Sequence, residues 1–223
     1  MEEIKISKII RSKRRTIALV LTQEAKLIIR APIKTPEGYI HNFVAKSEKW
    51  IKKKIKEIKL KPALPEKEFV AGESFLYLGR NYLLRFENNS LEPLEFKDCI
   101  IVNTKEKSAA RELLIKWYKA EAKQKISERC GWFSKITGYR PVSVRITNAQ
   151  KRWGSCSAKG NLNFSWRLIM APLDIIDYVI IHELVHIAQK NHSKRFWNKV
   201  GTILPDYKKK RDWLKENGRY FRI

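Results

Sequence analysis

The chain has 223 residues, 43% hydrophobic and 31% charged, proportions typical of a folded protein with a buried core and not of a disordered one. No run of about 18 uncharged apolar residues is present, as a membrane-spanning helix would need, and the N-terminus has no apolar leader, so we expect a cytoplasmic protein with no membrane partner. The 47 Lys and Arg residues outnumber the 23 Asp and Glu residues, giving a net charge of +24 that favours acidic or polyanionic partners. Three widely spaced cysteines (Cys99, Cys130 and Cys156) form no CxxC pair, which fits a reducing compartment.

The first third of the chain is the most basic part, with 17 basic and 6 acidic side chains in residues 1–62, a net +11. Segments 4–10, 15–21 and 26–31 predict short strands, and 36–60 predicts one long basic helix. On that helix we expect Trp50 on the apolar side with the isoleucines and the lysines opposite, with no aromatic ring among them. The lysines would form either a solvated surface or a platform for phosphate backbones.

A proline-rich linker is expected at 60–67, followed by a strand pair around Gly79, a short strand at 100–102 and a long helix beginning near Thr104. Further along, 142–147 predicts a strand, and 152–155 with 161–166 predicts a β-hairpin. We therefore expect an α+β protein divided into a strand-rich N-terminal region, 1–103, which contains the basic helix, and a C-terminal domain, 104–223.

The motif that indicates chemistry is His182-Glu183-Leu-Val-His186, inside an apolar helical segment. Residues i and i+4 share one helical face about 5–6 Å apart, so both imidazoles can reach one metal ion. Glu183 lies one step around the helix, where it can act as general base on a metal-bound water. Zinc would lower the pKa of that water to about 7.

The sequence offers two candidates for the third metal ligand. His192 follows His186 by six residues and can return to the metal only if the helix ends first, which we expect at Asn191 in the left-handed conformation. Asp206 is the alternative ligand, although it also suits the N-cap of a helix. His41 is expected to be a surface or packing residue.

Several motifs in chain order resemble the YgjP-like metallopeptidases, zincins related to the SprT-like proteases. They are Arg11-Ser-Lys-Arg-Arg-Thr, Trp50-Ile, Arg152-Trp-Gly-Ser-Cys-Ser, Asn161-Leu-Asn-Phe-Ser-Trp-Arg-Leu, Ala171-Pro, Asp177-Tyr-Val-Ile-Ile-His-Glu-Leu-Val-His, Asn191-His-Ser-Lys-Arg-Phe-Trp and Pro205-Asp-Tyr. The resemblance implies a zincin-like catalytic domain in 104–223, with Zn²⁺ bound by His182, His186 and His192 and with Glu183 catalytic.

In zincins an edge strand beside the metal holds an extended peptide, so the hairpin before the active-site helix supplies candidates for substrate binding. They are Arg152, Trp153, Gly154 and Asn163. Tight packing of the hairpin on the helix would explain the same residues. Cys156 is expected to be a small buried residue, and Arg167 either an anion-binding or a surface residue.

Three functions remain open at this point. The first is a zinc metallopeptidase acting on peptides or unfolded proteins. The second is a metal-dependent nucleoside triphosphate pyrophosphohydrolase, for which the positive charge favours a nucleotide substrate. The third is a nucleic-acid-associated protein with a structural zinc.

Overall fold

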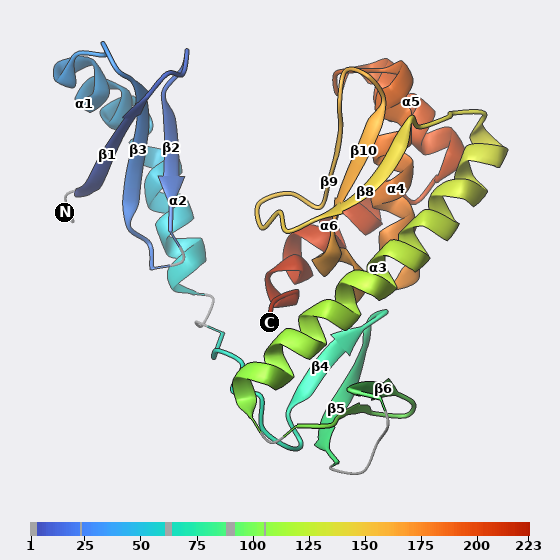
Figure 1. Ribbon diagram of the computed structural model, residues 1–223. Helices are drawn as coiled ribbons and strands as arrows, with labels where there is room; N and C mark the ends of the chain where they lie inside the picture. The colour runs from blue at the N-terminus through green and yellow to red at the C-terminus, as the bar shows by residue number, and fades with distance from the viewer. Residues whose placement is uncertain (1–3, 23, 61–63, 88–91, 105) are drawn as a thin grey trace. The chain divides into compact units, whose positions relative to one another are not determined.

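The computed structural model describes residues 4–22, 24–60, 64–87, 92–104 and 106–223. The chain forms two compact units, Met1–Pro65 and Glu66–Ile223, each of which is described by itself (Figure 1). Both units combine helices with strands, as the patterns along the sequence predict. None of the described helices is both long and apolar enough to cross a bilayer.

The first unit is a three-stranded sheet covered by two helices (Figure 1). Its elements are β1 (Ile6–Ser12), β2 (Ala18–Leu21), β3 (Leu27–Pro32), α1 (Glu37–Lys46) and α2 (Glu48–Lys59). The central strand β3 pairs in parallel with β1 and antiparallel with β2. Alternate β3 side chains face the helices, so the sheet contributes one side of a core made of Leu27, Ile29, Ala31, Ile40, Val44 and Ile51.

The helical segment of this unit differs from the single helix expected over 36–60. Ser47, with φ −97° and ψ 5°, interrupts it and separates α1 from α2. In α2 the fully buried residue is Ile51, and its neighbour Trp50, 100° around the helix, is 47% exposed. The expectation that Trp50 lies on the buried side is therefore wrong, because α2 has its own axis and its isoleucines already fill the side toward the sheet.

The second unit contains two small sheets and a long central helix (Figure 1). The first sheet has the order β4-β5-β7-β6, formed by β4 (Ser74–Tyr77), β5 (Arg80–Phe86), β6 (Leu94–Phe96) and β7 (Ile100–Val102). After α3 (Lys107–Thr137) comes the second sheet, ordered β8-β10-β9, with β8 (Ser143–Thr147), β9 (Gly154–Cys156) and β10 (Asn161–Ser165). The remaining elements are η1 (Trp166–Met170), α4 (Leu173–Ala188), α5 (Lys194–Ile203), α6 (Tyr207–Asn217) and η2 (Gly218–Tyr220).

Residues 66–103 belong to this second unit, so the expected boundary at 103/104 falls inside it. The first sheet contributes Phe75, Leu84 and Ile100 to the same core as Leu114 of α3. The β4–β5 turn is also fastened to the segment before α4, since the N–H groups of Leu78 and Gly79 donate to the carbonyls of Ile169 (2.9 Å) and Met170 (3.1 Å). The expected linker at 60–67 lies partly outside the described residues.

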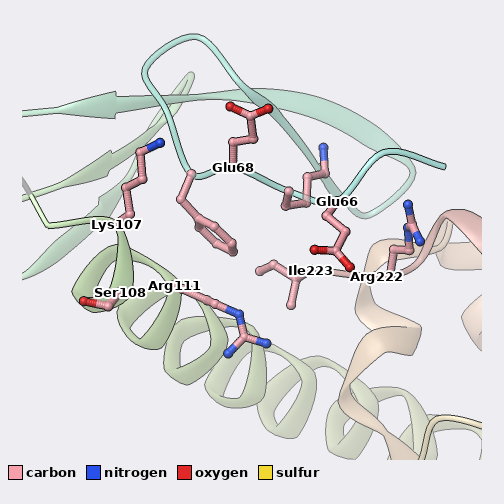
Figure 2. Close-up of a pocket in the computed structure, with 9 residues that line it drawn as sticks. Glu66, Glu68, Lys107, Ser108, Arg111, Arg222 and Ile223 are labelled. Atoms are coloured by element: carbon pink, nitrogen blue, oxygen red, sulfur yellow. The ribbon is translucent and has the colours of Figure 1, made fainter.

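A pocket of about 470 Å³ shows the same association of distant segments (Figure 2). Residues from the start of the unit, from the first turns of α3 and from the end of the chain line it: Glu66, Lys67, Glu68, Phe69, Lys107, Ser108, Arg111, Arg222 and Ile223. It contains both acidic and basic groups and includes none of the histidines.

Candidate metal centre

The candidate metal centre is built on α4, a helix with apolar residues on most of its surface. Nine of its side chains are buried, among them Ile180, Ile181, Leu184 and Val185 on both sides of the histidines. The helix is held against α3 by a bidentate ion pair in which the Arg129 guanidinium donates to both carboxylate oxygens of Asp177, each at 2.6 Å. This packing fixes the backbone that carries His182 and His186.

The chain turns back sharply after α4, which brings His192 to the other two histidines. The helix ends at Ala188, and Gln189 adopts an extended conformation with φ −127° and ψ 99°. The expectation that Asn191 closes the helix in the left-handed conformation is wrong, since Asn191 is absent from the described non-glycine residues with positive φ. Instead the Asn191 side chain accepts a hydrogen bond from the Ser193 N–H (3.3 Å), which shapes the turn into α5.

The Nε2 atoms of the three histidines converge on one point. The distance from Nε2 of His192 to Nε2 of His182 is 2.9 Å, and to Nε2 of His186 it is 3.2 Å. Tetrahedral zinc with Zn–N bonds of about 2.0–2.1 Å separates two ligand nitrogens by about 3.4 Å, so these two separations are shorter than those of a zinc site by about 0.2–0.5 Å. Among the described residues this is the sole group of three or more ligand-type side chains close enough to hold one ion.

The protonation of the rings also suits a cation. Nδ1 of His186 lies 2.9 Å from the Gln189 carbonyl, which can only accept, so Nδ1 carries the proton and Nε2 presents its lone pair. Burial, with smaller contributions from His186 and His192, lowers the pKa of His182 to about 3, and burial likewise lowers the pKa of His186. These two rings are therefore neutral near pH 7, as metal ligands must be.

Aromatic rings hold the most exposed of the three histidines. The His192 ring stacks on Trp197 with centroids 5.6 Å apart and an interplanar angle of 26°, and Trp197 in turn stacks on Tyr207 at 5.3 Å and 14°. Phe196 lies against all three imidazoles, with centroid distances of 4.5–4.9 Å. Sequence reasoning did not identify this support, since the spacing of Phe196 and Trp197 on α5 is also that of ordinary core residues.

Glu183 is buried beside the histidines and directly beneath β9. Its side chain is 6% exposed, and burial raises its pKa to about 7, an effect that Arg152 opposes. A Cβ atom on Gly154 would lie 2.6 Å from both Cγ and Oε1 of Glu183. Glycine is thus the residue that lets this strand lie over the carboxyl group.

Strand β9 is at the edge of its sheet and presents main-chain groups there. The Trp153 carbonyl accepts from the Ser165 N–H (2.8 Å), and the Ser157 N–H donates to the Asn161 carbonyl (2.9 Å), so the odd-numbered residues point their N–H and C=O groups toward β10. In an antiparallel ladder the intervening residues point these groups away. The N–H and C=O groups of Gly154 and Cys156 therefore face the open edge.

The four predicted substrate-binding residues do not lie together. Gly154 lies over Glu183, and Arg152, exposed, is close enough to influence its pKa. Asn163 pairs with Ser155, on the face of the sheet opposite Gly154. Trp153 packs against the end of the chain, where a Cβ on Gly218 would lie 2.7 Å from its ring and Phe221 is 5.4 Å away.

The other candidates lie outside the histidine cluster. Asp206 is the N-cap residue of α6 and forms an ion pair with Lys210 (3.1 Å). Cys156 is half-buried, with Sγ 3.4 Å from the Ser157 carbonyl. The Arg167 guanidinium covers the Trp166 ring at 4.3 Å, and His41 is exposed on α1.

Comparison with known proteins identifies a family. The family model described as "YgjP-like, metallopeptidase domain" matches residues 15–217. A search of solved structures finds the crystal structure of the metallopeptidase zymogen of Pyrococcus abyssi abylysin. The two sequences are 25% identical over the match, which covers 39% of this chain and 89% of that chain with a TM-score of 0.37. No curated protein matches the chain significantly.

Proposed function

Because the chain belongs to the YgjP-like metallopeptidase family, we propose that it is a zinc-dependent peptidase with His182, His186 and His192 as ligands and Glu183 as general base. The observation that carries the proposal is the convergence of three Nε2 atoms beside a buried carboxyl group and an open strand edge. Zinc bound there would lower the pKa of water and polarise the scissile carbonyl.

The residues of this chain supply the other parts of the reaction. An extended substrate segment pairs with the outward N–H and C=O groups of Gly154 and Cys156, which aligns its main chain along β9. Glu183, beneath Gly154, takes a proton from the attacking water and transfers it to the leaving amine. The substrate class that suits main-chain pairing is a peptide or an unfolded protein.

Two observations favour this function over the alternatives. No carboxylate cluster suited to a magnesium–nucleotide complex accompanies the histidines in the described parts of the chain. Three protein ligands also leave one coordination position open, whereas structural zinc sites are usually closed by four.

The test compares the wild-type protein with Glu183→Gln, both loaded with zinc. We expect one zinc per chain in each, and cleavage of a reduced, alkylated protein that falls about 10²–10⁴-fold in the variant. Release of phosphate or pyrophosphate from nucleoside triphosphates is measured in parallel. Glutamate-dependent release without any proteolysis would contradict the peptidase proposal, and so would an inactive zinc-loaded wild type across a broad peptide library.

The third ligand has a matched test of its own. His192→Ala should weaken zinc binding measured by competition with a chromophoric chelator, whereas Asp206→Ala should leave it unchanged because that carboxylate pairs with Lys210. The reverse result would assign the ligand to Asp206.

A further inference from the structure

The first unit carries a concentrated positive charge that the metal centre does not use. Residues 1–65 contain 17 basic and 6 acidic side chains, against 30 and 17 in the other 158 residues. Four lysines of α2 lie on its solvent side at spacings of three and four residues, which places neighbours about 5–6 Å apart. We call Lys49, Lys52, Lys53 and Lys56 the α2 lysine face.

Most of this face has no neutralising partner. The two acidic residues of α2 pair with Lys52 (Glu48, 2.6 Å) and with Lys54 (Glu57, 2.5 Å). Within the part of the chain that the structure describes, Lys49, Lys53 and Lys56 form no ion pair. Like charges at these spacings repel one another, so the arrangement costs helix stability unless an anion is bound.

An exposed aromatic ring borders the lysines. Trp50 is 47% exposed and lies one turn before Lys53 and Lys54. A tryptophan beside unpaired lysines is the combination that binds unstacked bases together with their phosphates. A role as a solvated surface would not explain why a tryptophan side chain is exposed beside these lysines.

The other side of the helix excludes insertion into a membrane as an explanation. Ile51 is fully buried, and Ile55 packs against the core that the sheet forms. A membrane-surface helix needs its apolar face free to enter the lipid, and here the folded unit already occupies that face (Figure 1).

We propose that the first unit binds single-stranded nucleic acid without sequence preference, with the α2 lysine face on consecutive phosphates and Trp50 stacked on a base. The partner is identified by its chemistry: a chain of negative charges whose bases are free to stack. This inference is independent of peptide hydrolysis, because it concerns residues of the other unit.

The first experiment measures binding of the full-length protein to a fluorescein-labelled 20-nucleotide oligothymidylate by anisotropy at several salt concentrations. The triple variant Lys49→Gln, Lys53→Gln, Lys56→Gln should bind more weakly, with a slope of log K against log salt that is less steep by about 2. The control has the same change of charge on exposed lysines of α6, Lys208→Gln, Lys209→Gln, Lys215→Gln, and should retain the wild-type slope.

The second experiment tests the ring. Trp50→Ala should lower affinity for the oligothymidylate about tenfold with the salt slope unchanged, and Trp50→Phe should retain most of the affinity. A 20-base-pair duplex, whose bases are already stacked, should show no such loss. Thermal melting of each variant establishes that the exposed substitution leaves the fold intact.

Four results would overturn the proposal. They are no binding at low salt, equal weakening by the α2 and α6 triple variants, no effect of Trp50→Ala on the single strand, and tighter binding to phosphatidylserine vesicles than to the oligonucleotide.

Discussion

At Gly154 the strand passes so close to Glu183 that one added methyl group would enter the space of the carboxyl group. A Cβ there lies 2.6 Å from Oε1, so Gly154→Ala must displace the Glu183 side chain. Because a displacement of about 1 Å can cost 10²-fold in rate, we expect peptidase kcat/KM to fall by about that factor with zinc content unchanged.

The matched control for that substitution is Gly131→Ala in the interior of α3. A Cβ at Gly131 meets nothing within 4 Å, so activity should be retained and stability should rise by about 0.5–1 kcal/mol. Full activity of Gly154→Ala would show that Glu183 does not need its present position.

Trp197 supports His192, one of the three proposed zinc ligands, by stacking on its ring. Removing its ring by Trp197→Ala frees His192, and we expect zinc affinity to fall about 10–100-fold, measured by chelator competition. Trp197→Phe should restore most of the affinity. Trp50→Ala, which removes a half-exposed tryptophan from the first unit, should leave zinc binding at the wild-type level.

Among single residues, the sequence predicts those whose chemistry and spacing act together. His182 and His186 share a helical face by periodicity alone, and Glu183 follows from the same motif. The roles of Trp153 and Gly218 depend on a contact between segments 65 residues apart, which no local pattern records. The helix end at Gln189 carries no glycine or proline signal either.

At the level of elements, the β4–β5 turn is docked against the start of α4. A Cβ on Gly79 would lie 2.7 Å from Cγ and 2.9 Å from Cα of Pro172, whereas a Cβ on Gly72 would meet nothing within 4 Å. Both glycines have positive φ, +79° and +82° respectively. Comparing an alanine substitution at each glycine therefore distinguishes the cost of backbone strain from the cost of losing the docking contact.

We expect Gly72→Ala to lower the free energy of unfolding by about 1–2 kcal/mol, the usual cost of a left-handed alanine. Gly79→Ala should cost about 1–3 kcal/mol more, because backbone atoms of Pro172 block the added carbon. Chemical denaturation measures both. Equal losses would mean that the turn can move away from α4 at little cost.

The prediction of elements succeeded where periodicity was long or the turn signal clear. The strands at 6–12 and 27–32 and the helix from 107 onward follow patterns of that kind. The interruption at Ser47 was not predicted, since serine is compatible with a helix interior and the apolar spacing continues beyond it. Strand β6 was not predicted, because Leu94-Glu-Phe96 follows a proline and lacks the run of β-branched residues that marks the equally short β7.

For the whole molecule, the relevant feature is the presence of two separate cores. The core of the first unit consists entirely of residues 27–51, and that of the second entirely of residues 69–221. Proline-rich composition suggested the linker, but assigning 66–103 to the second unit required knowing that Phe75 and Leu84 pack with α3. Local sequence patterns do not predict that packing, because it joins segments far apart in the chain.

Because the cores are separate, a substitution in one core should destabilise only the unit that contains it. Ile51→Ala should lower the free energy of unfolding of the first unit by about 2–5 kcal/mol, because Ile51 is fully buried there. Zinc affinity of the second unit should be unchanged. The test pairs calorimetry with chelator competition. Leu114→Ala, in the other core, should instead lower the free energy of unfolding of the second unit and leave that of the first unit unchanged.

If β9 holds the substrate as we propose, its open edge has a consequence for the timing of cleavage. A three-residue strand that offers the main-chain groups of only two residues can hold a target segment only after that segment has left its own structure. The rate on a folded target would then follow the equilibrium for its local opening, tenfold for each 1.4 kcal/mol. Such an enzyme would select its substrates by how often they unfold locally, more than by their amino-acid sequence.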